Sequence, residues 1–143
     1  MNNQYIVDAS IMVQLLVTEA HTPETKMLFA SVDDGNALIV PEFCLLECTN
    51  VLWKHVRFHG LAQADSEKQL RILSVLDIRI TPIIGLMPRS LEIGLKYQLA
   101  VYDSVYIALA EKLNTPLITD DNRQAQAART EGLILKDVTD FAR

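Results

Sequence analysis

The chain has 143 residues, of which half are hydrophobic, and its formal net charge is −5 at pH 7. This length suits one globular domain with a sizeable core, and the acidic charge argues against nucleic-acid binding through a broad basic patch. Two cysteines, Cys44 and Cys48, are too few for a disulfide framework. Because we find neither a cationic leader nor an apolar run of about 18 residues, we expect a cytoplasmic protein with no membrane association.

Short apolar runs alternate with amphipathic stretches along the whole chain. Boundary residues support several helices, with Ser10 and Thr22 as caps, Pro23 at a first helical position and Gly60 at an end. In chain order, the predicted elements are a strand over 5–8, helices over 10–18 and 22–32, a strand over 36–41, helices over 41–60 and 62–76, a strand over 77–83, helices over 88–99 and 102–113, a strand over 115–119, a helix over 122–132 and a strand over 133–137.

Strands that alternate with helices predict parallel strands joined by right-handed crossovers. The strands are apolar, as expected when helices cover both faces of a sheet. We therefore predict an α/β fold, a three-layer α/β/α sandwich with a short parallel sheet. No repeat or linker interrupts the pattern, so one domain is expected to span residues 1–143. In such sheets, ligands bind outside the carboxyl ends of the strands.

Acidic residues fall at that edge of the predicted sheet. Asp8 ends the first strand, Asp120 and Asp121 follow the fourth, and Asp103 begins a helix. Glu47 lies within an apolar helix, where about 100° of turn per residue places it at the border of the buried face. Asp8, Asp103 and Asp121 each have an alternative role as a helix N-cap, although Ser10 competes with Asp8 for it. Capping explains Glu47 least well.

These carboxylates come from four separate segments that the topology brings to one edge. Like charges gathered in one place push protons back onto each other unless a cation neutralises them. Oxygen ligands select hard divalent ions such as Mg²⁺ or Mn²⁺, which activate water and bind phosphoryl oxygens. The residues therefore indicate metal-assisted phosphodiester hydrolysis, without choosing between Asp120 and Asp121. Arg123 follows this acidic segment by two residues and is the best candidate for a phosphate contact.

Three blocks of sequence resemble a known family. "VDASIMVQLL", "VPEFCLLECTNVL" and "YDSVYIALAEKLNTPLITDDNRQA", in this order, are similar to the PIN-domain ribonucleases, specifically the VapC-like toxins of type II toxin–antitoxin pairs. The third block is the most specific, because it combines an acid before a small-residue-rich helix with a strand that ends in Thr-x-Asp. The resemblance covers almost the whole chain and implies the PIN fold.

The resemblance also implies roles for individual residues. The family's catalytic and metal-ligating acids fall on Asp8, Glu47, Asp103 and Asp121, with Asp120 as an accessory. Ser10 and Thr119 would position water or phosphate. The implied activity is that of a Mg²⁺- or Mn²⁺-dependent endoribonuclease acting on RNA, and the implied partners are a second copy of the chain, as a homodimer, and a cognate antitoxin.

Three alternatives compete with this interpretation. A zinc site is disfavoured because its potential ligands would be strung along one helix over too great a length; they are Cys44, Cys48, His55 and His59. A phosphatase motif of the Asp-x-Asp type is disfavoured because Ser10 occupies the position of the second acid. The third alternative is a non-catalytic PIN-like binding module that acts through an apolar surface; the residues considered for it are Met27, Leu28, Trp53 and Phe58.

Overall fold

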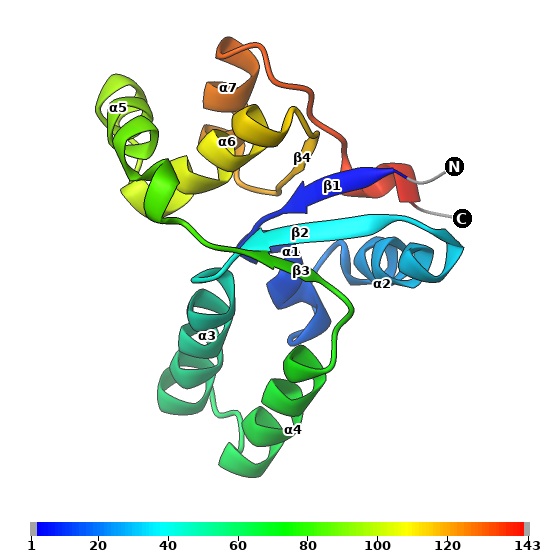
Figure 1. Ribbon diagram of the computed structural model, residues 1–143. Helices are drawn as coiled ribbons and strands as arrows, with labels where there is room; N and C mark the ends of the chain where they lie inside the picture. Colours follow the sequence, from blue (N-terminus) through cyan, green and yellow to red (C-terminus); the bar gives the residue numbers. More distant parts are fainter. Residues whose placement is uncertain (1–2, 142–143) are drawn as a thin grey trace.

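A computed structural model describes residues 3–141, and its fold is α/β (Figure 1). The strands found in this part of the chain are Gln4–Val7 (β1), Ala37–Pro41 (β2), Arg79–Thr81 (β3) and Leu117–Ile118 (β4). They form one sheet in the order β3-β2-β1-β4, and every pairing is parallel. Tyr5 lies opposite Leu38, and Ile6 lies opposite both Ile39 and Leu117. The carboxyl ends of β1 and β4 are therefore neighbours.

Helices cover both faces of this sheet, which confirms the predicted sandwich (Figure 1). The α-helices within residues 3–141 are Ala9–Met12 (α1), Thr22–Ala30 (α2), Cys44–Phe58 (α3), Gln63–Ser74 (α4), Met87–Tyr97 (α5), Val101–Leu113 (α6) and Asn122–Thr130 (α7). Figure 1 shows α1–α4 on one side and α5–α7 on the other. None of the helices in the described part of the chain is long and apolar enough to cross a membrane.

The core lies between β1 and the helices on either face. Ile6 and Val7 are fully buried, and every residue of α6 from Ser104 to Ala110 is buried. An apolar sequence with small residues suits a helix that is enclosed on all sides. Gly94 of α5 lets that helix approach closely, because a Cβ there would lie 3.0 Å from the backbone oxygen of Leu99. Asp103, the acid in the first turn of α6, is thus held on a rigid element.

The predicted strand over 133–137 is wrong. Leu135 makes only an isolated parallel bridge with Leu117. The chain then turns, because the Asp137 carboxylate accepts a hydrogen bond from the backbone N–H of Thr139 (2.9 Å). A 3₁₀ turn over Val138–Phe141 follows. Hydrogen bonds between a side chain and the nearby backbone compete with strand pairing, and here they take the place of the predicted strand. The apolar sequence pattern alone does not reveal this competition.

Several predicted helix starts are also wrong. The helix expected to begin at Pro41 begins at Cys44, because Pro41 still pairs with Thr81 at the end of β2. Thr22 is the first residue of α2 rather than its cap. The helix over 10–18 is shortened to α1, which passes into a 3₁₀ turn over Val13–Leu15.

Candidate active site

Asp8 lies where β1 emerges at the carboxyl edge of the sheet. Its side chain caps α1, because Oδ1 accepts a hydrogen bond from the backbone N–H of Ile11 (3.3 Å); the prediction that Ser10 is the cap is therefore wrong. The residue is only 4% exposed. Burial raises the pKa of Asp8 from its ordinary value of 3.8 to about 7, although hydrogen bonds from Ser10, Thr119 and Ile11 oppose this shift. A carboxylate here is costly unless a positive charge approaches it.

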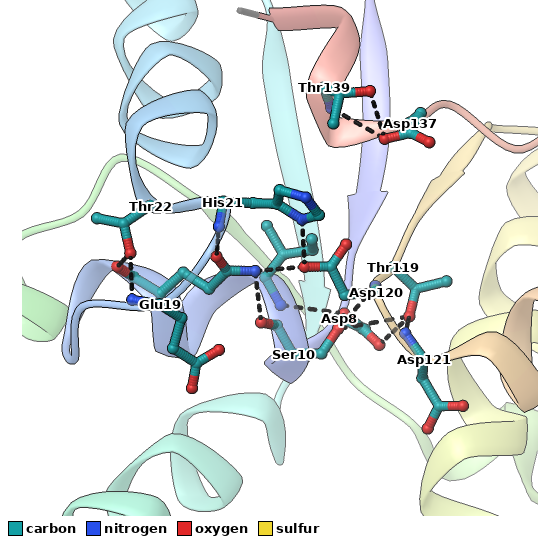
Figure 2. A network of polar contacts seen from close by, with 12 residues as sticks. Asp8, Ser10, Glu19, His21, Thr22, Thr119, Asp120, Asp121, Asp137 and Thr139 are labelled. Atoms are coloured by element: carbon teal, nitrogen blue, oxygen red, sulfur yellow. Dashed lines mark hydrogen bonds and ion pairs between the residues drawn. The ribbon is translucent and has the colours of Figure 1, made fainter.

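Ser10 and Thr119 connect Asp8 to the loop after β4 (Figure 2). The Ser10 hydroxyl donates to Asp8 Oδ1 (2.6 Å) and accepts from the backbone N–H of Asp120 (3.0 Å). The Thr119 hydroxyl donates to Asp8 Oδ2 (2.5 Å) and accepts from the backbone N–H of Asp121 (2.9 Å). Each hydroxyl thus orients one oxygen of Asp8 and one peptide of the loop. With the Ile11 bond, about one of the four lone-pair directions of the Asp8 carboxylate stays free.

Asp120 and Asp121 point in different directions. Asp120 Oδ2 accepts from the Gln14 amide and lies 3.1 Å from His21 Nδ1, on the side of α2. Asp121 caps α7, since its Oδ1 accepts from the backbone N–H of Gln124 (3.0 Å). Figure 2 shows the Asp121 carboxylate turned away from Asp120 and His21. This geometry separates two residues that sequence reasoning left equivalent, and it favours Asp121 as the member of the acidic set.

Asp103 lies in the first turn of α6, but it is not the cap. The cap position is Ala100, so the capping alternative for Asp103 is wrong. Within residues 3–141 its carboxylate accepts no hydrogen bond, and its side chain is half-buried. Burial raises the pKa of Asp103, and the charge of Asp121 raises it further, while Arg123 lowers it. An acid without a hydrogen-bond donor is free to bind something else.

Glu47 lies in the first turn of α3 and borders the core, as its position on the helix predicted. Its Oε1 accepts a hydrogen bond from the buried hydroxyl of Tyr106 on α6 (2.8 Å). Burial raises the pKa of Glu47; the Tyr106 bond opposes the shift and the charge of Asp103 adds to it. Cys44 and Cys48 are fully buried on the neighbouring face of α3, as core packing predicted.

The four acids follow one another around the sheet edge as electrostatic neighbours. Asp121 repels Asp8 and Asp103, and Asp103 repels Glu47, each raising the pKa of its neighbour. Within residues 3–141, however, no three His, Cys, Asp or Glu side chains converge tightly enough to enclose a metal ion. The site is thus an open arc of carboxylates rather than a closed cage. An arc of this kind matches an ion that keeps several of its own waters.

Arg123, the predicted RNA contact, lies on the exposed face of α7. Its Nη2 donates to the backbone oxygen of Gln98 (2.6 Å), which joins α7 to the connection between α5 and α6. The charge of Arg123 also lowers the pKa of Asp103. Arg123 therefore lies at the rim of the acidic arc, and its own positive charge is close to Asp103.

Sequence reasoning missed three supporting residues. Gln14 is buried, donates to Asp120 and accepts from the backbone N–H of His21 (2.9 Å). The His21 side chain stays largely accessible to solvent, and the hydrogen bond to Asp120 raises its pKa. Tyr106 fixes Glu47. Only Gln14 gave a signal in the sequence, as a single polar residue within the apolar run IMVQLL.

Comparisons with known proteins agree with this architecture. A family model described as the PIN domain matches residues 5–130. The chain is 27% identical over 123 residues to ribonuclease VapC3 of Pyrobaculum aerophilum, a match covering 85% of this chain and 92% of that protein. It is 29% identical over 126 residues to ribonuclease VapC9 of Mycobacterium tuberculosis, covering 88% and 92%.

Solved structures show the same fold. PAE2754 from Pyrobaculum aerophilum superposes with a TM-score of 0.74 at 22% identity, covering 98% of this chain and 94% of that one. VapBC2 from Rickettsia felis, bound to a DNA fragment from its promoter, gives 0.70 at 15% identity, covering 94% and 98%. The family model spans most of the chain and confirms the resemblance of the three sequence blocks: the chain belongs to the PIN domain family.

Proposed function

We propose that this chain is a Mg²⁺- or Mn²⁺-dependent endoribonuclease and the toxin of a type II toxin–antitoxin pair. The observation that carries the proposal is the arc of four carboxylates from four segments at the carboxyl edge of the sheet, with buried Asp8 at one end of it. The two relatives compared above are both named ribonucleases. One structural neighbour, VapC20 of Mycobacterium tuberculosis, is described as a toxin that cleaves the sarcin–ricin loop.

The donor set fits a hard divalent cation. All four side chains offer only oxygen, which Mg²⁺ and Mn²⁺ prefer over zinc-type ligands. Asp8 is a buried carboxyl that forms no ion pair within residues 3–141, and the Asp103 carboxylate accepts no hydrogen bond from those residues. Mg²⁺ is usually held by one or two carboxylates and several waters, so the open arc does not argue against it.

The residues divide the work of hydrolysis between them. A divalent ion bound here would lower the pKa of a coordinated water and balance the charge on phosphate oxygens. Asp8, Asp103 and Asp121 would hold the ion, and the hydroxyls of Ser10 and Thr119 keep Asp8 oriented for this. Tyr106 donates to Glu47 Oε1, whereas Oε2 accepts no hydrogen bond from the part of the chain that the structure describes. The raised pKa of Glu47 favours taking a proton at Oε2.

Cleavage of RNA tests the proposal directly. With Mn²⁺ or Mg²⁺ the protein is expected to cut single-stranded RNA, and EDTA should stop the reaction. Asp8→Asn should lower the rate at least about a hundredfold, because a metal ligand matters no less than the partners that orient one. Undiminished cleavage by Asp8→Asn would refute the proposed metal site. Calorimetry that finds no binding of either ion at neutral pH would favour the non-catalytic binding module.

Arg123 is proposed to contact a phosphate of the RNA. Arg123→Ala should weaken RNA binding and reduce its salt dependence by about 0.7 in the slope of log K against log salt concentration, the value for one phosphate contact on a single strand. Arg129→Ala is the matched control, because Arg129 lies at the far end of the same helix. Calorimetric Mn²⁺ affinity should change little by comparison; unchanged RNA binding would contradict the role.

The partners follow from the same family relation and remain proposals. A cognate antitoxin is proposed because structural neighbours are toxin–antitoxin complexes, among them VapBC-1 from Haemophilus influenzae. A homodimer is proposed because helix α5 and the turn before it expose apolar side chains at helical spacing; they are Ile84, Met87, Leu91 and Leu95. A cytoplasmic location is proposed because a ribonuclease toxin would meet its RNA substrate inside the cell.

A further inference from the structure

The outer half of α3 combines aromatic and cationic side chains on an acidic protein. Trp53 is 55% exposed and Phe58 is 64% exposed, and their rings meet edge to face with centroids 5.8 Å apart. The guanidinium carbon of Arg57 lies 5.3 Å from the centre of the Phe58 ring. In the sequence, Lys54 lies between Trp53 and Arg57. No Asp or Glu occurs from Val51 to His59.

Ordinary helix stability explains only part of this composition. Cations near a helix C-terminus interact favourably with the helix dipole, which accounts for a positive charge at Arg57. Core packing does not account for Phe58, because more than half of its side chain faces solvent. Within residues 3–141, Lys54 and Arg57 form no ion pair, whereas Arg89 and Lys96 on α5 both bind Glu131. Both cations are thus available to an anion from outside.

The cluster lies on the same line as the acidic arc. At about 100° and 1.5 Å per residue, Lys54 and Phe58 lie within about 20° of the Glu47 direction, roughly 10 and 17 Å further along the axis. Glu47 itself points to Tyr106 at the sheet edge. Figure 1 shows α3 running outward from that edge, opposite α5 and α6. One face of the helix therefore leads from the acids to the aromatic ring.

We propose that this face of α3 binds the single-stranded RNA that extends beyond the cleaved bond, with a base stacked on Phe58 and a phosphate on Lys54. A second phosphate would lie on Arg57, which flanks this face and contacts the Phe58 ring. The inference rests on the proposed ribonuclease function and adds a binding surface to it. Aromatic stacking with cationic contacts to the backbone is how single strands are bound without sequence preference. A distance of about 17 Å corresponds to about five nucleotides of a stacked strand.

Trp53 supplies a direct readout, because it is the only tryptophan of the chain and contacts Phe58. Its fluorescence is measured as single-stranded RNA of about 12 nucleotides, within the usual site sizes of single-strand binders, is added with Mg²⁺ to Asp8→Asn protein. Binding should quench the emission. Phe58→Leu should weaken binding about 5- to 150-fold, the effect of losing one stacked base, while Phe58→Tyr should bind like the parent protein.

Matched variants separate stacking from other causes. Lys54→Gln should reduce the slope of log K against log salt concentration by about 0.7, and Lys54→Arg should not. Ile134→Ala removes an equally exposed apolar side chain outside α3 and should leave binding unchanged. RNA of about four nucleotides, too short to reach Phe58 from the acids, should bind the Phe58→Leu and parent proteins alike.

The outcomes distinguish RNA binding by α3 from the ribonuclease activity on which the inference rests. If the wild type cleaves RNA and Phe58→Leu binds and cleaves long RNA equally well, the surface is wrong and the ribonuclease stands. If the wild type cleaves nothing but quenching still depends on Phe58, the surface stands without the ribonuclease. A surface that serves an apolar peptide instead would tolerate Phe58→Leu in RNA binding, which overturns the inference.

Discussion

Asp8→Asn will make the metal-free protein more stable at about pH 8 while lowering its proposed ribonuclease rate at least about a hundredfold. The pKa of Asp8 is about 7 in the folded protein and 3.8 ordinarily. A shift of roughly three units corresponds to at most about 4 kcal/mol, at about 1.36 kcal/mol per unit. We expect a gain of about 1–3 kcal/mol, because the carboxamide keeps some but not all of the hydrogen bonds from Ser10, Thr119 and Ile11.

The pH dependence of this effect has a definite sign. A raised folded-state pKa means that the native protein binds an extra proton between about pH 4 and 7, so stability falls as pH rises across that interval. The contribution of protonated Asp8 is complete below the ordinary pKa and lost once pH passes about 7. Wild type and Asp8→Asn should therefore match near pH 4 and diverge progressively up to about pH 8.

Thermal or urea unfolding in EDTA measures the difference. Asp33→Asn is the matched control, because it removes the same charge from an exposed position in the turn after α2. Its stability should follow the wild type at every pH. Adding Mg²⁺ should stabilise the wild type but not Asp8→Asn, since a ligand stabilises only a protein that binds it. A wild type that is the more stable of the two at about pH 8 in EDTA would contradict the costly buried carboxylate.

The sequence predicted the sandwich because its main signals are large. Apolar runs such as YIVD and the continuous apolar face of α6 identify buried elements whatever their exact ends. The rule that ligands bind at carboxyl strand ends then placed Asp8 and Asp121 together correctly. Predictions failed where one hydrogen bond decides a boundary, as at Asp137, whose carboxylate bonds Thr139 and ends the fifth predicted strand.

Partnerships between distant residues are what sequence reasoning missed. Gln14 and His21 meet Asp120 across about a hundred residues of chain, and no local pattern encodes that contact. The same contact decides the roles of the two adjacent aspartates, because Asp120 turns toward His21 while Asp121 caps α7. Periodicity places a residue on an edge or a face, but the direction of a short side chain depends on which donors the fold brings near it.

Removing the hydroxyls that hold Asp8 is expected to have the second large effect. In Ser10→Ala/Thr119→Val protein, both charged oxygens of Asp8 lose a hydrogen bond that favours ionisation, so the pKa of Asp8 should rise above about 7. Protons and divalent ions compete for the same carboxylate. Mn²⁺ affinity and RNA cleavage at pH 7 should fall about 10- to 100-fold, the usual cost of removing groups that orient a metal ligand.

The shape of the pH profile separates this cause from simple disruption. If ionisation of Asp8 is at fault, kcat/KM at subsaturating Mn²⁺ recovers toward the wild-type value as pH rises to about 9, because the acid limb has only moved. Thr119→Ser keeps a hydroxyl and should keep the wild-type profile. The two hydroxyls also accept from the backbone N–H groups of Asp120 and Asp121, so the competing explanation is that their loss releases the loop. Release of the loop would misplace Asp121 at every pH, and a uniform loss across the profile would therefore overturn the assignment of Ser10 and Thr119 as the groups that tune Asp8.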